Sequence, residues 1–144
     1  MDDVKSGCVM DDNTIFVDVS PCTHEPLFTT HRDVEVRFED VDKYLRQLNE
    51  RNAYGHNDWR LGHKQEIDIL LAHQKEGALK DTFNYNRWTI DGFLGEQFAP
   101  HRMSSEDLTS DNRGLWVEGD HGCRIIVDEF RALVTVRPVR SGPL

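Results

Sequence analysis

Two stretches of the chain repeat apolar side chains at the spacing of an amphipathic helix. The first runs from residue 41 to about residue 52 and follows Asp40, a predicted N-cap. The second runs from about residue 63 to residue 74. The apolar stripes are Val41, Tyr44, Leu45 and Leu48 in the first helix, and Ile67, Leu70 and Leu71 in the second. The pattern therefore predicts two helices in the first half of the chain.

Alternating apolar and polar residues predict strands on both sides of these helices. The predicted strands are residues 14–19, 33–38, 88–90, 115–117, 123–127 and 132–139. Short polar turns join the last three strands, so we expect a three-stranded meander in which Pro138 marks a sheet edge or a strand end. The fold class predicted is α+β, with two helices packed on a mainly antiparallel sheet.

The same pattern predicts the domain organisation. Residues 1–13 are acidic and weakly patterned, and we expect a loose leader there. Residues 14–144 are expected to form a single domain. Residues 93–113 have little periodicity and are interpreted as a long loop, a kind of segment that often carries function.

Composition narrows the class of protein. The 144 residues include 17 Lys and Arg against 26 Asp and Glu, which gives a net charge of −9. A hydrophobic content of 38% excludes a disordered chain, and no apolar run reaches the roughly 20 residues that span a bilayer. Direct nucleic-acid binding is not expected, because it relies on clustered Lys and Arg. The acidic N-terminus, which is unlike a secretory signal, predicts a cytoplasmic protein that does not bind membranes.

The three cysteines, Cys8, Cys22 and Cys123, fit no metal-binding spacing. We interpret them as reduced structural thiols of a cytoplasmic protein. The alternative is a disulfide bond between Cys22 and Cys123, which is expected only if the chain is exported.

The seven histidines suggest a metal site, but their spacing favours structural roles. His63 and Glu66 are three residues apart and fit a helix cap or a surface pair better than a metal pair. His73 lies about 80° around the helix from His63, so the two do not share a ligand face. The sequence also lacks a nucleophile elbow and a phosphate-binding glycine loop. We therefore predict no catalytic residues, no metal and no cofactor.

Acidic residues in two predicted loops are the next candidates. His121 lies in a predicted hairpin turn beside Asp120 and Glu118, where a polar turn is favoured over a proton-transfer or metal site. Glu106, Asp107 and Asp111 lie in the long loop, without the ligand spacing of a calcium loop.

Three tryptophans lie beside turns, and we consider for each a place in the core and a place on a recognition surface. Trp59 is predicted to be a core residue. Arg60 alternates to the opposite face and is predicted to pair with a carboxylate such as Glu66. Trp88 and Trp116 also fit the core, but they flank the long loop and are candidate recognition residues. The predicted binding surface comprises loops 88–113 and 118–122, with Trp88, Asp91, Glu106, Asp107, Asp111, Trp116, Glu118, Asp120 and His121 as its residues.

Residues 52–61, Asn-Ala-Tyr-Gly-His-Asn-Asp-Trp-Arg-Leu, precede Gly62 and a helix that carries Glu66 and Leu70. With Trp88-Thr89 and the ending Val136-Arg-Pro-Val-Arg140, this segment resembles the signature of the DUF1566 family, over about residues 35–140. That family includes the C-terminal domain of the Legionella collagen-like adhesin.

The resemblance implies a C-type-lectin-like or sulfatase-modifying-factor-like fold, used mostly in modules of secreted or surface proteins. The adhesin domain binds sulfated polysaccharides, which a chain of net charge −9 would repel. Gly62 and His63 replace the Pro and the Ser or Thr that are usual in the family. The paired cysteines of the sulfatase-modifying enzymes have no counterpart here.

Three functions remain open at this point. The first is a non-enzymatic binding module for a protein or a neutral glycan. The second is a small acidic inhibitor, for example phage-encoded, that occupies the basic nucleic-acid groove of a host defence protein. The third and least favoured is a metal-dependent enzyme that uses His121. The charge is uneven, since the first twenty residues hold five aspartates and one lysine, whereas arginines dominate from His121 onward.

Overall fold

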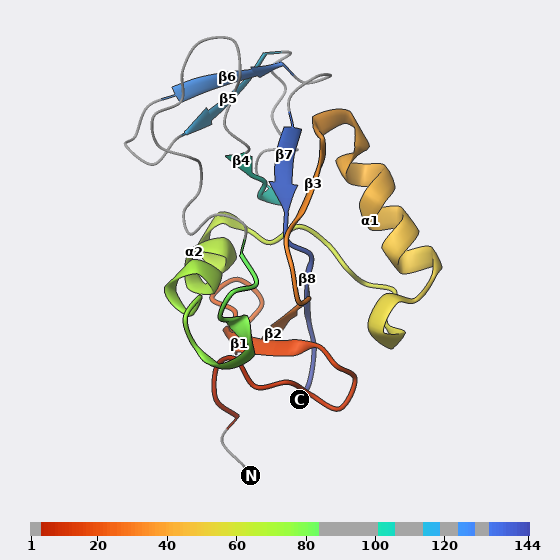
Figure 1. Ribbon diagram of the computed structural model, residues 1–144, viewed down its shortest axis with the longest axis vertical. Coiled ribbons are helices and arrows are strands. Elements are labelled where there is room, and N and C mark those ends of the chain that lie inside the picture. Colours follow the sequence, from red (N-terminus) through yellow and green to blue (C-terminus); the bar gives the residue numbers. More distant parts are fainter. Residues whose placement is uncertain (1–3, 84–100, 106–113, 119–123, 129–132) are drawn as a thin grey trace.

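The computed structural model describes residues 4–83, 101–105, 114–118, 124–128 and 133–144. Over these residues it is an α+β structure with two helices and three small, mainly antiparallel sheets. The helices are α1 (Val41–Glu50) and α2 (Lys64–Ala72), and they lie on opposite sides of the central strands (Figure 1). Short 3₁₀ turns occur at η1 (Phe38–Asp40), η2 (Ala53–Gly55) and η3 (Gly77–Leu79).

The eight described strands form three sheets. The first sheet has the order β1-β2-β8, the second β3-β7-β4, and the third is the hairpin β5-β6. All pairings are antiparallel except that of β4 with β7. The strands are β1 (Ile15–Val19), β2 (Pro26–Thr29), β3 (Val34–Arg37), β4 (His101–Arg102), β5 (Gly114–Glu118), β6 (Arg124–Asp128), β7 (Leu133–Val136) and β8 (Val139–Ser141).

Both predicted helices are present, with small differences at their ends. Asp40 precedes α1 as expected, but its side chain makes no capping hydrogen bond, because the 3₁₀ turn η1 already gives it a helical backbone conformation. Helix α2 begins at Lys64 with His63 as its N-cap, and its backbone N–H donates to Glu66 (2.8 Å). The cap expected between His63 and Glu66 is therefore present.

The predicted three-stranded meander is wrong. β5 and β6 pair as expected, but residues 132–139 do not form a third strand beside them. Pro138, which has no N–H to donate, separates β7 from β8, and the two belong to different sheets. β7 pairs with β3 and β4, whereas β8 pairs with β2. The predicted strand at residues 88–90 lies outside the described residues.

Two apolar clusters form the core. One packs the buried face of α1 against Trp59, Leu61 and strand β7, and the other packs α2 against β1, β2 and β8. The first cluster consists of Val41, Leu45, Leu48, Trp59, Leu61, Met103, Val134 and Val136. The second consists of Ile15, Val17, Leu27, Ile67, Leu70, Leu79 and Val139. Each helix therefore covers its own sheet.

The interior also contains a cluster of charges. Asp33 is fully buried and its Oδ1 lies 2.7 Å from Arg102 Nη1 and 2.9 Å from Arg137 Nε. The Phe83 ring lies 4.2 Å from the Arg137 guanidinium and 5.4 Å from that of Arg102. Burial, the largest influence, lowers the pKa of Arg137 to about 10, while the Asp33 carboxylate opposes that shift.

The segment before β1 is attached to the domain. Gly7 N–H donates to Phe16 C=O (2.8 Å), and Gly7 C=O accepts from Ala78 N–H (2.8 Å). The leader expected at residues 1–13 is thus joined to both β1 and η3 from Gly7 onward. In the described part of the chain, no helix has the length and apolarity needed to cross a membrane.

Candidate functional site

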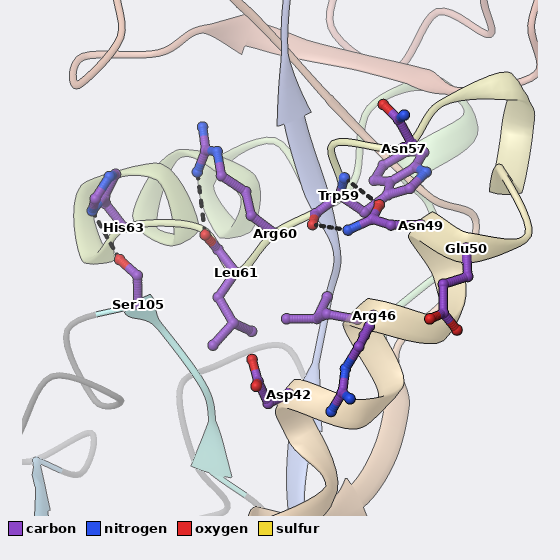
Figure 2. A pocket seen from close by; sticks show the side chains of 11 residues that line it. Asp42, Arg46, Asn49, Glu50, Asn57, Trp59, Arg60, Leu61, His63 and Ser105 are labelled. Carbon is purple, nitrogen blue, oxygen red and sulfur yellow. Dashed lines mark hydrogen bonds between the residues drawn. The ribbon is translucent and has the colours of Figure 1, made fainter.

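A pocket of about 700 Å³ lies between α1 and the extended segment that leads into α2 (Figure 2). We call it the α1 groove. It is lined by Asp42, Leu45, Arg46, Asn49, Glu50, Asn57, Trp59, Arg60, Leu61, His63 and Ser105. The groove therefore combines carboxylate, guanidinium and amide groups with apolar side chains.

One wall of the α1 groove is a single face of α1. Residues 42, 45, 46, 49 and 50 follow the i, i+3, i+4, i+7, i+8 spacing that puts side chains on one side of a helix. Leu45 is buried and belongs to the core, whereas Asp42, Arg46 and Glu50 are exposed. An apolar base and a charged rim therefore come from the same helix face.

The Asn49 side chain hydrogen-bonds α1 to the opposite wall, whose Trp59 and Leu61 also pack against the helix. Asn49 Nδ2 donates to Trp59 C=O (3.0 Å), and Trp59 N–H donates to Asn49 Oδ1 (2.7 Å). The amide thus satisfies both backbone groups of Trp59, as a neighbouring strand would. The Trp59 indole N–H donates to Ala53 C=O (2.8 Å), and the residue is 3% exposed, as expected for a core residue.

Arg60 fastens the same wall to the sheet and to α2. Its backbone exchanges two hydrogen bonds with Val139 of β8 (3.0 and 2.9 Å). Its guanidinium binds both carboxylate oxygens of Glu66 (2.8 and 3.0 Å) and Ser141 Oγ (2.8 Å). The predicted pair of Arg60 with Glu66 is present, and Arg60 alternates away from the buried Trp59 and Leu61 as expected.

Glu66 is the centre of this network. Its carboxylate is fully buried and accepts hydrogen bonds from Arg60, from Ser20 Oγ (2.5 Å) and from the His63 N–H. Burial by itself would raise the pKa of Glu66, but these three donors together hold it at about 2. Glu66 is therefore ionised at neutral pH and acts as a structural anchor between β1, β8 and α2.

His63 and Ser105 form the far end of the α1 groove. His63 Nδ1 lies 2.8 Å from Ser105 Oγ, and Ser105 N–H donates to Gly62 C=O (2.9 Å). These contacts place the chain just before residue 106 against the start of α2 (Figure 2). The predicted loop is therefore wrong at its described residues: His101–Arg102 form β4 beside β7, Met103 and Ser104 are buried, and Ser105 lines the α1 groove.

The structure describes only part of the predicted binding surface. Trp88, Asp91, Glu106, Asp107, Asp111, Asp120 and His121 lie outside the described residues, as does Cys123. Trp116 and Glu118 lie in β5, where their backbones face Ile126 and Arg124 of β6. These residues stay predictions.

Sequence reasoning missed most of the α1 groove. Asp42, Arg46, Asn49 and Glu50 occupy the polar face of a helix, a position that carries no signal of ligand binding by itself. The nearest signal in the sequence is the segment Asp58-Trp59-Arg60-Leu61, in which Trp59 and Arg60 are predicted to alternate between opposite faces.

The described histidines His56 and His73 have carboxylate partners. His73 Nε2 lies 3.0 Å from Asp18 Oδ2 and its Nδ1 2.8 Å from Glu76 Oε2, and His56 Nε2 lies 2.6 Å from Asp12 Oδ2. Burial would lower the pKa of His73, but the two carboxylates raise it above its usual range. Within residues 4–83 and the later described segments, no group of three or more His, Cys, Asp or Glu is placed to hold a metal ion.

Comparison with known proteins does not show which family this chain belongs to. No protein-family model matches the chain, and no curated protein matches it.

Proposed function

We propose that this chain is a non-enzymatic binding module that recognises a protein segment or a neutral glycan. The observation that supports the proposal is the α1 groove, whose two walls are fixed before any ligand arrives. Asn49 joins the walls through both backbone groups of Trp59, and Arg60 is held by Glu66 and Ser141. A site with preformed walls loses little conformational entropy on binding.

The lining chemistry suits a ligand that both donates and accepts hydrogen bonds. Asp42 and Glu50 accept, Arg46 donates, and Asn57 does both, above the apolar Leu45 and Leu61. Peptide backbones and sugar hydroxyls offer this mixed pattern. Sulfated glycans are disfavoured, because the groove's two carboxylates, Asp42 and Glu50, and the net charge of −9 would repel them.

The resemblance to the DUF1566 family supports the same class of function. The Arg60–Glu66 pair and the buried Trp59 give structural roles to the residues that carry the resemblance. We therefore extend the proposal to a C-type-lectin-like fold in which loops 88–113 and 118–122 complete the binding surface beyond Ser105.

The test is binding of the purified chain to an array of neutral and sulfated glycans and to a display library of peptides. Asp42→Ala is expected to weaken binding of the selected ligand about tenfold or more, which is the loss of a well-placed charged hydrogen bond. Glu39→Ala is the matched control, since Glu39 is exposed near α1 and does not line the groove. Equal losses in the two variants would contradict the assignment of the groove.

Trp88→Ala and Trp116→Ala test the loop part of the proposal. Each is expected to weaken binding of the same ligand while the protein stays folded, because tryptophans in a recognition surface contribute strongly to binding. Capture of ligand at wild-type strength by both folded variants would remove the loops from the binding surface.

The acidic inhibitor remains a second candidate, supported by the net charge and by the exposed acids Glu39, Asp40 and Asp42 at the start of α1. It predicts that partner binding weakens steeply with added salt and on neutralising Glu106, Asp107 and Asp111. A partner that stays bound in molar salt would rule it out.

A further inference from the structure

A second pocket lies beside the segment that precedes β1. Its volume is about 480 Å³, and none of its lining residues is shared with the α1 groove. Apolar side chains line it, including Phe28, Val9 and Leu144. Of the three large hydrophobic side chains exposed in the described residues, two line this pocket, Val9 at 46% and Leu144 at 52%. An exposed apolar group of this kind is typical of interaction surfaces.

The backbone beside this pocket is a sheet edge. Cys8 C=O accepts from Phe16 N–H (2.9 Å), and Met10 N–H donates to Thr14 C=O (2.8 Å). Val9, between them, faces Ile15 in an antiparallel bridge. In an antiparallel ladder, successive residues direct their backbone groups to alternate sides, so the N–H and C=O of Val9 point away from β1.

That edge is open within the described residues. There, the Val9 C=O receives a weak contact from the Cys8 thiol (3.7 Å), and no backbone group pairs with it or with the Val9 N–H. An edge with an outward N–H and C=O is a template for an added strand. The adjoining pocket would then receive a side chain of that strand.

Acidic groups border the edge and the pocket. Asp11 is exposed, and Asp12 contacts His56 (2.6 Å) and Thr14. The positive charge of Arg140 is offset by Asp58, whose Oδ1 lies 2.8 Å from Arg140 Nε. Asp11 and Asp12 therefore make this surface negative, which favours a cationic partner.

We propose that residues 8–11 and the adjoining pocket bind an extended peptide segment of a partner protein, with an apolar side chain next to a lysine or arginine. The main chain of the segment pairs with Val9 N–H and C=O, as in strand addition to other sheets. Its apolar side chain enters the pocket over Phe28, and its basic side chain meets Asp11. This proposal does not depend on the function proposed for the α1 groove.

The test uses two fluorescein-labelled, end-capped peptides of alternating sequence, one of valine and lysine and one of valine and glutamate. Fluorescence anisotropy at low salt is expected to show about tenfold or stronger preference for the valine–lysine peptide. Val9→Pro removes the outward N–H and is expected to weaken that peptide about tenfold, whereas Val9→Ala keeps the N–H and most of the affinity. Equal binding of the two peptides, or wild-type binding by Val9→Pro, would overturn the proposal.

Asp11→Lys provides an independent variant if Val9→Pro does not fold. It lies on the surface and is expected to reverse the preference toward the valine–glutamate peptide. An unchanged preference would refute the charge argument. Light scattering tests whether a second copy of this chain occupies the edge instead. If the wild-type chain is a dimer and Val9→Pro or Asp11→Lys makes it a monomer, the edge is a dimer interface and the peptide proposal fails.

Discussion

Replacement of Glu66 by glutamine tests the network that fixes one wall of the α1 groove. The carboxylate is fully buried and accepts hydrogen bonds from two nitrogens of Arg60, from Ser20 and from His63. Glutamine keeps the shape and one acceptor oxygen, but it places an NH₂ group against these donors. The negative charge that balances Arg60 is also lost.

The magnitude follows from the pKa of Glu66. The network lowers it from 4.5 to about 2, and each unit corresponds to about 1.4 kcal/mol. The Arg60 side chain is 32% exposed, so water screens part of the interaction. After that discount, Glu66→Gln is expected to lower the free energy of unfolding by about 2 kcal/mol at neutral pH.

The pH dependence provides the sharper measurement. Because the folded pKa lies below the unfolded one, the stabilisation is complete above about pH 4.5 and is lost as the pH falls toward 2. Urea unfolding of the wild-type and Glu66→Gln proteins, followed by tryptophan fluorescence, should therefore show a difference that shrinks across this range. Glu50→Gln, at an exposed position, is the control and should change stability by less than about 0.5 kcal/mol. A Glu66→Gln protein as stable as the wild type at neutral pH would refute the reasoning.

Three further outcomes are expected. Gly77→Ala should lower the free energy of unfolding in urea by about 1–3 kcal/mol, because the residue has a φ of +52° and its Cβ would lie 2.6 Å from the backbone oxygen of Gly7. Gly55→Ala, with open space around its Cβ, is the control and should have the smaller effect. NMR titration should give His73 a pKa above its usual value, and an unshifted titration would contradict this. The contacts of His73 with its carboxylate partners should stabilise the protein at acidic pH, and this stabilisation should be lost as the pH rises through the folded pKa. Asn49→Ala leaves both backbone groups of Trp59 without their amide partner and should lower the unfolding free energy by about 1–3 kcal/mol, with a changed near-UV circular dichroism spectrum; wild-type stability would show that water replaces the amide.

The parts of the structure that the sequence predicted correctly are local in the chain. The stripe of α1 recurs within one helix, and the pair of Arg60 with Glu66 spans six residues. The alternation of Trp59 and Arg60 likewise follows from the geometry of an extended segment. Short-range geometry determines each of these features, so residue spacing was sufficient to predict them.

The parts that the sequence did not predict depend on distant partners. Ser105 reaches His63 across 42 positions, and nothing in either neighbourhood indicates the other. Pro138 correctly marked a strand end, but whether β7 joins β6 or β3 is decided by packing of the whole chain. Asn49 joins the two walls of the α1 groove through the backbone of Trp59, which a helical pattern cannot show.

The position of β8 has a consequence for synthesis of the protein. β2 obtains its second partner only when residues 139–141 arrive, since Leu27 pairs with Ser141. A nascent chain therefore carries β2 with one open side until residues 139–141 have left the ribosome, and such long-range pairing slows folding. The unpaired strand is a point where chaperones or other nascent chains can bind.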